Sequence, residues 1–279
     1  MVMRLPMPAA DSVALVAQVV AERQGGVNKT FFNTIQTEWA DRVQHYLNSH
    51  GSPHAVPRWA AVQGSSSKFL NLYLSPTKNS VQGAVLQTLR SHELTICPAC
   101  GEPGRPNTLD HYLPKVAYPH FCITPANLFP MCDACQQAKG EKTADSTSPR
   151  FFIHPYFDAF VAEQVLRLNI DAPFDAPGFQ LVVVEELSSD EKALVQSHVR
   201  ELEIEQRYAK FFRDMYRRLL RLVSVMRQSG QDVPGSLASF RAGVAYPSVN
   251  GWEHVFYDAV VETPALMNYI TNSDLPGYL

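Results

Sequence analysis

The sequence predicts a mainly α fold of the α+β class, in which helical N- and C-terminal regions flank a small zinc-stapled core. In the first third, apolar residues recur at helical spacing in residues 14–21, 31–47 and 81–89. Helical spacing fades over the next sixty residues, where Cys, Pro, Gly, Asn and His are concentrated. It then returns between residues 188 and 230. These changes define three consecutive regions: 1–92, 93–158 and 159–279.

The N-terminal segment favours a helix over a signal peptide. Its apolar run is interrupted by Pro6, Pro8, Asp11 and Gln18, and no small-residue cleavage site follows. Asp11 or Ser12 would cap this helix and Gly25-Gly26 would end it. No apolar run is long enough to span a membrane, so we expect a cytoplasmic protein without a membrane partner. Residues 51–53 and 64–67 are expected as breaks between the helices that follow.

The C-terminal region predicts two strands and then helices. The strand-like runs are residues 165–170 and 179–185, separated by a turn-rich stretch. A single long helix is expected from Ser188, which fits a capping box with Glu191, to Gly230. The tail from Pro234 onward predicts shorter helices broken by prolines, which are Pro247, Pro264 and Pro276.

The second half of the expected long helix is strongly basic. The chain as a whole carries a net charge of −3, so nucleic-acid contact requires a local basic patch or a partner. A phosphate-binding face is one interpretation of this helix, with Arg217 and Arg218 as its first candidates. A solvated face paired with acidic neighbours is the alternative. The basic residues are Arg207, Lys210, Arg213, Arg217, Arg218, Arg221 and Arg227.

Cysteine spacing predicts a structural zinc site. Four of the five cysteines form two C-x-x-C pairs, and Cys122 stands alone. Two intervening residues allow both thiolates of a pair to reach one tetrahedral ion, and Gly101 permits the tight turn of the first pair. Buried thiols and a thioredoxin-like redox motif are the alternatives; two pairs in one short segment favour zinc. The ligands would be Cys97, Cys100, Cys132 and Cys135.

Between the cysteine pairs lies an Asp-His dipeptide, Asp110-His111, followed later by Asn127. Adjacent side chains on an extended segment face opposite sides. Asp110 would then bind a cation while His111 faces a water molecule. An isolated Asp-His pair is often structural, but its position between two zinc pairs favours a catalytic role.

The order C-x-x-C, Asp-His, Asn-Leu, C-x-x-C and Lys, over about residues 95–155, resembles the cysteine-containing HNH (ββα-metal) endonucleases. The resemblance implies that His111 is the general base and that Asp110 binds a catalytic cation, Mg²⁺ or Mn²⁺. It also implies that Asn127 orients the loop and helps to hold the base. The sequence Asp-His-Tyr-Leu-Pro-Lys at residues 110–115, followed by Tyr118-Pro119 and Asn127-Leu128, resembles stand-alone HNH proteins of anti-phage systems, of the Septu type that works with an ATPase partner.

One position departs from the family's pattern. The family commonly has Asn or His directly after the second C-x-x-C as a cation ligand, and this chain has Gln136. The sequence leaves open whether Gln136 or His154 completes the cation site, or whether His154 is a packed core histidine. Lys115 and Lys139 would hold phosphate oxygens, with solvated lysines as the alternative.

The residues and the resemblance together predict an endonuclease that hydrolyses DNA by a one-metal mechanism with a histidine base; RNA is not excluded as substrate. The resemblance further implies that the protein is an effector of anti-phage defence. Two other classes of function remain open. One is a zinc-stabilised nucleic-acid or protein binding module with a decayed nuclease site, of which Gln136 would be the sign. The other is a thiol redox protein, which predicts readily oxidised C-x-x-C pairs without tightly bound zinc.

Overall fold

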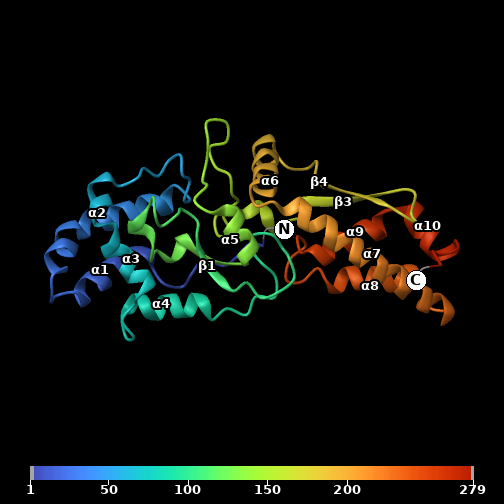
Figure 1. Cartoon of the computed structure of the whole chain (residues 1–279), viewed down its shortest axis with the longest axis horizontal. Helices are drawn as coiled ribbons and strands as arrows, with labels where there is room; N and C mark the ends of the chain where they lie inside the picture. The colour runs from blue at the N-terminus through green and yellow to red at the C-terminus, as the bar shows by residue number, and fades with distance from the viewer. Residues whose placement is uncertain (1–2, 278–279) are drawn as a thin grey trace. The chain divides into compact units, whose positions relative to one another are not determined.

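A computed structural model describes residues 3–277, which form two compact units (Figure 1). The first, the ββα unit, comprises residues 5–94 and 105–158. The second, the C-terminal unit, comprises residues 95–104 and 159–277 together with residues 3–4. The units interleave along the chain, a different division from the three consecutive regions expected from the sequence. The fold is mainly α with two small antiparallel sheets, as the sequence predicts.

Two helices of the ββα unit begin at the expected places. Asp11 caps α1 (Ser12–Glu22) by accepting hydrogen bonds from Val13 N and Ala14 N, and Ser80 caps α4 (Val81–Arg90). The longest helix of the unit, α2, covers Lys29–Asn48. The expected break at residues 64–67 is wrong: a 3₁₀ turn (Ala60–Ser65) leads directly into α3 (Ser66–Leu74). This nine-residue helix buries only Phe69 and Leu72, too few apolar positions to show a period.

An aromatic core in the ββα unit supports the segment that carries the motif. Trp39 and Phe69 are completely buried and pack edge to face, with ring centroids 5.1 Å apart. The Trp39 indole donates a hydrogen bond to the carbonyl of His120 at 2.7 Å. The Cys122 thiol donates to the carbonyl of Phe69 at 3.0 Å. Helices α2 and α3 therefore fix the backbone of residues 120–122, next to the candidate site.

The motif forms a ββα arrangement. Strand β1 (Thr108–His111) pairs antiparallel with β2 (Leu128–Met131), with His111 opposite Leu128. Two short 3₁₀ turns, Pro119–Phe121 and Pro125–Asn127, lie in the connection between the strands. Helix α5 (Asp133–Lys139) follows β2 directly, with Cys132 at its N-cap. The two strands and the helix place residues from all three elements around Asp110.

In the C-terminal unit, the predicted strands are confirmed as β3 (Leu166–Asp171) and β4 (Gly178–Val183), which form a hairpin (Figure 1). The capping box of Ser188 and Glu191 is also present at the start of α6 (Ser189–Glu201). Three short helices form the tail. Pro264 separates two of them, as expected, and is the first residue of the second, because proline is tolerated in a first helical turn. They are α8 (Val233–Gly243), α9 (Trp252–Glu262) and α10 (Pro264–Asn272).

The single long helix expected from Ser188 to Gly230 is wrong, because the chain breaks between α6 and α7 (Ile204–Gln228). Glu203 adopts a left-handed conformation with φ of 52°. Leu202 and Ile204 on either side of it are both buried. Residues two apart in a continuous helix lie about 200° apart around the axis, so one helix cannot easily bury both against the same core. The break removes that conflict.

His120 in the ββα unit is expected to make the stability of the protein depend on pH. Its side chain is completely buried, and neither ring nitrogen has a hydrogen-bond partner. Burial, with the charge of Arg42 second, lowers the pKa of His120 from 6.5 to about 3. The unfolded chain therefore binds a proton between about pH 3 and pH 6.5 that the folded chain excludes. Stability from this residue is fully present above pH 6.5 and is lost as the pH falls through that window.

We expect His120→Phe to raise the free energy of unfolding by about 1 kcal/mol at pH 7, because it removes an unsatisfied buried polar ring. The gain is expected to be larger at pH 5, where the protonation cost disappears as well. Urea denaturation at the two pH values measures both effects, with His54→Phe, at an exposed position, as the control. An equal or smaller gain at pH 5 would contradict the assignment of a low pKa to His120.

Candidate functional site

The first cysteine pair lies on a tight turn in the C-terminal unit. The amide of Gly101 donates to the carbonyl of Cys97 at 2.7 Å, and the amide of Cys97 donates to the carbonyl of Glu102 at 3.0 Å. Gly101 has a φ of 74°, a conformation that favours glycine over other residues. The turn, called the first knuckle below, thus presents Cys97 and Cys100 from the same loop, an arrangement compatible with metal binding.

The second pair stands at the start of α5, with Cys132 at the N-cap and Cys135 in the first turn. The sulfurs of Cys97, Cys100, Cys132 and Cys135 all lie within 4.8 Å of one another. Sulfurs of a tetrahedral zinc thiolate site are about 3.8 Å apart, given Zn–S bonds of about 2.3 Å. Four cysteine sulfurs at this spacing could hold a structural metal ion such as zinc, as the sequence predicts.

Residues of the C-terminal unit surround the first knuckle with hydrogen-bond donors. Trp252 donates from its indole to the carbonyl of Cys100 at 2.5 Å, and His198 Nε2 lies 2.6 Å from the carbonyl of Ala99. The guanidinium of Arg207 contacts Glu102 Oε2 at 2.5 Å and Cys100 Sγ at 3.7 Å. Arg207, one of the basic residues of the expected long helix, therefore supports the knuckle electrostatically.

His111, at the end of β1, is held in one tautomer. Its Nε2 lies 2.9 Å from the carbonyl of Cys122, so this nitrogen carries the proton and Nδ1 keeps the lone pair. The ring of Tyr73 packs edge-on against it, with centroids 4.5 Å apart. Burial lowers the pKa of His111 from 6.5 to about 3. The imidazole is thus neutral near pH 7 and has a nitrogen able to accept a proton.

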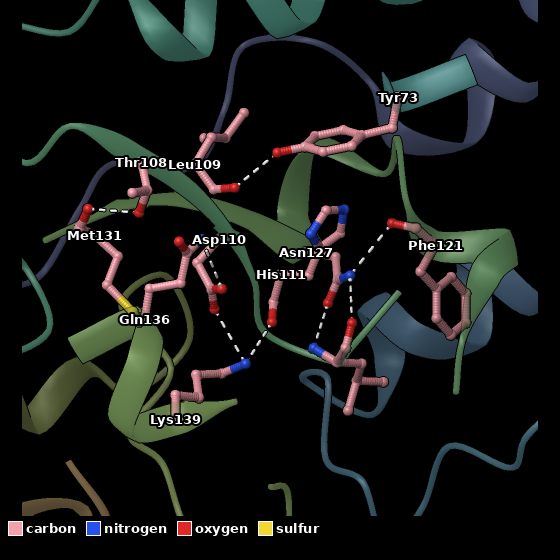
Figure 2. Close-up of polar contacts among 11 residues, drawn as sticks. Tyr73, Thr108, Leu109, Asp110, His111, Phe121, Asn127, Met131, Gln136 and Lys139 are labelled. Carbon is pink, nitrogen blue, oxygen red and sulfur yellow. Dashed lines mark hydrogen bonds and ion pairs between the residues drawn. The ribbon is translucent and has the colours of Figure 1, made fainter. Parts of the chain in front are cut away.

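Asp110 faces helix α5 (Figure 2). Its Oδ2 forms an ion pair with Lys139 Nζ at 3.0 Å, and its Oδ1 lies 3.5 Å from Gln136 Nε2. Lys139 is almost completely buried and also donates to the carbonyl of His111 at 2.7 Å. Asp110 and His111 thus make contacts with different partners, α5 for the carboxylate and Tyr73 for the imidazole.

Asn127 cross-links the loop between the two strands. Its Oδ1 accepts from the amide of Leu113 at 2.8 Å, and its Nδ2 donates to the carbonyls of Leu113 and Phe121 at 3.1 and 3.2 Å (Figure 2). The side chain is completely buried. By fixing the backbone next to Cys122, Asn127 positions the carbonyl that holds His111, although no hydrogen bond joins the two side chains.

The fold brings Gln136, and not His154, to Asp110. His154 Nε2 lies 2.9 Å from the Tyr46 hydroxyl, and its ring packs on that of Tyr112 with centroids 4.1 Å apart. Burial, followed by nearby positive charge, lowers the pKa of His154 well below 6.5. These contacts are those of a histidine packed in the aromatic core, the alternative that the sequence left open.

The basic residues expected to bind nucleic acid differ in their surroundings. Lys139 is engaged inside the site, against Asp110, instead of being presented to a phosphate. Lys115 is half-buried, and its charge lowers the pKa of His111 in addition to burial, whereas the hydrogen bond to the Cys122 carbonyl opposes this shift. Arg217 and Arg218 lie exposed on α7 in the C-terminal unit, with Arg217 4.0 Å from Asp214. That exposure is compatible with either interpretation of this helix face.

The surroundings of Asp110 fit a cation. Its Oδ2 is buried and has an ion pair but no aligned hydrogen bond. A carboxylate and an amide oxygen are hard ligands of the kind that Mg²⁺ and Mn²⁺ prefer, and Gln136 would present its oxygen after rotation of the amide. The ammonium of Lys139, 3.0 Å from Oδ2, already supplies one positive charge at this carboxylate, so an added ion would share Asp110 with it. Asp110 and Gln136 are therefore the residues that would hold a divalent ion.

Two residues beside the base were missed by the sequence analysis. Tyr73, on α3, donates from its hydroxyl to the carbonyl of Leu109 and packs on His111. Arg90, at the end of α4, lies over the Tyr73 ring at 5.4 Å. Both precede the motif in the sequence: Arg90 ends a helix whose spacing indicated only packing, and Tyr73 lies on a helix that the sequence did not indicate. No spacing signal links them to the Asp-His pair.

Comparison with known proteins gives one partial similarity. The chain is 30% identical to the protein ea31 of Escherichia phage lambda over 115 residues, which are 40% of this chain. The matched stretch spans 39% of the length of ea31. No family model matches the chain, and no solved structure matches it. The similarity is to a stretch of a phage protein whose name states no activity, so function has to be argued from the site.

Proposed function

We propose that this chain is a metal-dependent endonuclease of the HNH type that hydrolyses phosphodiester bonds of DNA. The observation that carries the proposal is the arrangement at the end of β1. There a neutral, single-tautomer His111 adjoins a buried carboxylate, Asp110, which pairs with the ammonium of Lys139. A base and a cation ligand on one strand, braced by a buried asparagine, suit an in-line displacement at phosphorus.

In the proposed mechanism His111 removes a proton from the attacking water through Nδ1. The carbonyl of Cys122, 2.9 Å from Nε2, stabilises the imidazolium that forms and keeps the ring oriented. Asn127 acts indirectly, by fixing the loop that presents this carbonyl. A cation held by Asp110 and Gln136 would neutralise charge that develops on the phosphate and the leaving oxygen.

A zinc-stabilised binding module with a decayed nuclease site is the second candidate. The ion pair between Lys139 and Asp110 favours it, because an ammonium already neutralises the carboxylate that a cation would need. The two candidates differ in metal content. A decayed site holds zinc on cysteines alone, whereas a working site also binds a second, exchangeable divalent ion.

The proposal is tested by cleavage of supercoiled plasmid with Mg²⁺ or Mn²⁺, with chelator as the control. Nicking that depends on the added ion supports the nuclease. By analogy with the Septu type, we propose that an ATPase partner restrains or activates the enzyme during anti-phage defence, so the assay is repeated with a candidate partner. The absence of cleavage in both conditions, on DNA and on RNA, contradicts the proposal.

The proposed compartment is the cytoplasm, where thiols stay reduced and available for zinc and where nucleic acid is accessible. Among the residues described, no helix has the length and apolar character needed to cross a membrane. The net charge of −3 gives little general attraction to DNA, which fits an enzyme whose substrate contact depends on local residues or on a partner.

Lys139→Met is expected to reveal whether Asp110 binds a cation. Loss of the ammonium leaves Asp110 with an unpaired buried charge, which typically costs about 3 kcal/mol. For a protein of this size the melting temperature should fall by roughly 10 °C in chelator. Added Mn²⁺ should restore part of the loss, because the ion replaces the missing positive charge. Thermal melts with and without Mn²⁺ measure both effects.

Two control variants show whether the effects of Lys139→Met arise from Asp110. The half-buried Lys115→Met removes the same charge without touching Asp110 and should show neither effect. The double variant Lys139→Met with Asp110→Asn should be less destabilised than Lys139→Met alone and should not respond to Mn²⁺. A Lys139→Met protein that gains nothing from Mn²⁺ would favour the decayed-site candidate.

A further inference from the structure

A basic pocket lies on the ββα unit beside the strand that carries Asp110 and His111. It has a volume of about 430 Å³ and opens between the end of α4 and the start of β1. Arg90, His92 and Arg105 supply its positive or titratable groups. Thr108 and Leu109 of β1, which directly precede Asp110, form part of its lining. The pocket and the candidate site thus share one strand.

A chain of contacts links this pocket to the proposed base. The Arg90 guanidinium lies over the ring of Tyr73 at 5.4 Å, and Tyr73 packs edge-on against His111 at 4.5 Å. The Tyr73 hydroxyl donates to the carbonyl of Leu109, a lining residue, at 2.8 Å. Arg90 is also close enough for its charge to contribute to the low pKa of His111, after burial and two lysines.

The arginines of the pocket are available for a ligand. Arg90 and Arg105 are both exposed, and neither forms an ion pair with a carboxylate within residues 3–277. Burial, followed by the charge of Arg105, lowers the pKa of His92, so these two side chains lie close together. Two guanidinium groups without acidic partners, on the rim of one pocket, create a local positive field in a chain of net charge −3.

We propose that Arg90 and Arg105 form a phosphate-binding subsite, which holds a phosphodiester flanking the one placed at His111. Guanidinium groups bind phosphate oxygens through paired N–H donors, and such contacts set the register of a nucleic acid without reading its sequence. The inference rests on the proposed function, because it assigns a nucleic-acid strand to the same site. Tyr73 links the subsite to the proposed base, because its ring packs on His111 and the guanidinium of Arg90 lies over the same ring.

The experiment measures binding separately from cleavage. A fluorescently labelled DNA duplex of mixed sequence is titrated with zinc-loaded protein, without added Mg²⁺ or Mn²⁺, at about 50 mM salt and above, and anisotropy is recorded. The double variant Arg90→Gln/Arg105→Gln should bind at least roughly tenfold more weakly. Its slope of log affinity against log salt should be smaller by about 2, the number of phosphate contacts removed. Arg90→Lys keeps the charge but loses the paired N–H donors of the guanidinium. Its affinity should lie between those of the parent protein and the double variant.

A matched control removes the same charge elsewhere on the ββα unit. Arg58→Gln/Lys78→Gln replaces two exposed cations outside the pocket and should change affinity by less than about twofold. Equal affinities for the two double variants would overturn the subsite. So would a parent protein that shows no measurable binding at the lowest salt concentration.

Cleavage assays distinguish failure of the phosphate subsite from failure of the nuclease proposal. If the parent protein cuts no nucleic acid but loses affinity on substitution of Arg90 and Arg105, the subsite stands and the nuclease proposal fails. If the parent cuts and the arginine variant keeps both its rate and its affinity, the subsite fails and the nuclease proposal stands. Reduced affinity together with reduced cleavage at low substrate concentration supports both.

Discussion

His111→Ala is expected to lower the rate of plasmid cleavage by about 10³-fold, the usual contribution of a positioned general base. The physical reason is the loss of the nitrogen that accepts the proton of the attacking water, while the cysteine cluster and the Asp110–Lys139 pair are untouched. Initial rates of nicking at saturating Mn²⁺ measure the effect. Zinc content, determined on the same preparation, should stay unchanged.

Truncation of His111 also affects stability, so a second variant is needed. Alanine leaves a cavity and removes the donor from the carbonyl of Cys122, which costs about 1–3 kcal/mol. His111→Gln fills more of the space and keeps an N–H in reach of that carbonyl, yet its amide is no base. We expect it to melt closer to the parent and to be equally inactive. Exposed His54→Ala should retain full activity.

Full activity in both His111 variants would show that the imidazole is not the base. Activity lost in alanine but retained in glutamine would assign His111 a packing role. Only loss in both variants, with a folded His111→Gln protein, supports the proposed mechanism. The pair of substitutions thus separates the chemistry of the ring from its contribution to the fold.

Cys132→Ala is expected to have the largest effect on stability. One missing thiolate weakens metal binding, and the binding free energy of a structural zinc ion is part of the folding free energy. We expect less than one zinc per chain, a melting temperature lower by roughly 10 °C or more, and poor solubility. Metal analysis by mass spectrometry and thermal melts with and without chelator check this expectation.

Cys122→Ala is the matched control for the zinc prediction. Its thiol is buried and donates to the carbonyl of Phe69 at 3.0 Å, and it does not belong to the four-cysteine cluster. The substitution should cost about 1–2 kcal/mol without loss of zinc. If Cys132→Ala keeps a full equivalent of zinc, or if Cys122→Ala loses it, the assignment of the four ligands is wrong.

The sequence alone predicted the elements that depend on local rules. Side chains next to a helix start satisfy its first amides, so the caps at Asp11 and the capping box at Ser188 could be recognised from residues a few positions apart. The metal site of the two C-x-x-C pairs could also be predicted from the sequence, because the spacing of two thiolates determines whether both reach one ion. The strands β3 and β4 followed from two strand-like runs on either side of a turn-rich stretch, whereas their pairing came from the structure.

Tertiary contacts decided what local rules leave open. The helix expected from Ser188 to Gly230 satisfied every local preference, yet Leu202 and Ile204 are both buried and the chain breaks between them at Glu203. Burial is a property of the whole packing arrangement, so no window of sequence contains it. For the same reason the short helix around Phe69 was not anticipated.

In the candidate site, too, some residues could be predicted from the sequence and others only from the tertiary structure. Asp110, His111 and Asn127 could be proposed from the sequence because their order along the chain is a motif. The choice of Gln136 over His154 beside Asp110, the burial of Lys139 against that carboxylate, and the approach of Tyr73 and Arg90 to the base required the fold. These contacts join residues that are distant in the sequence, and only packing of α3, α4 and α5 around β1 sets which side chains meet there.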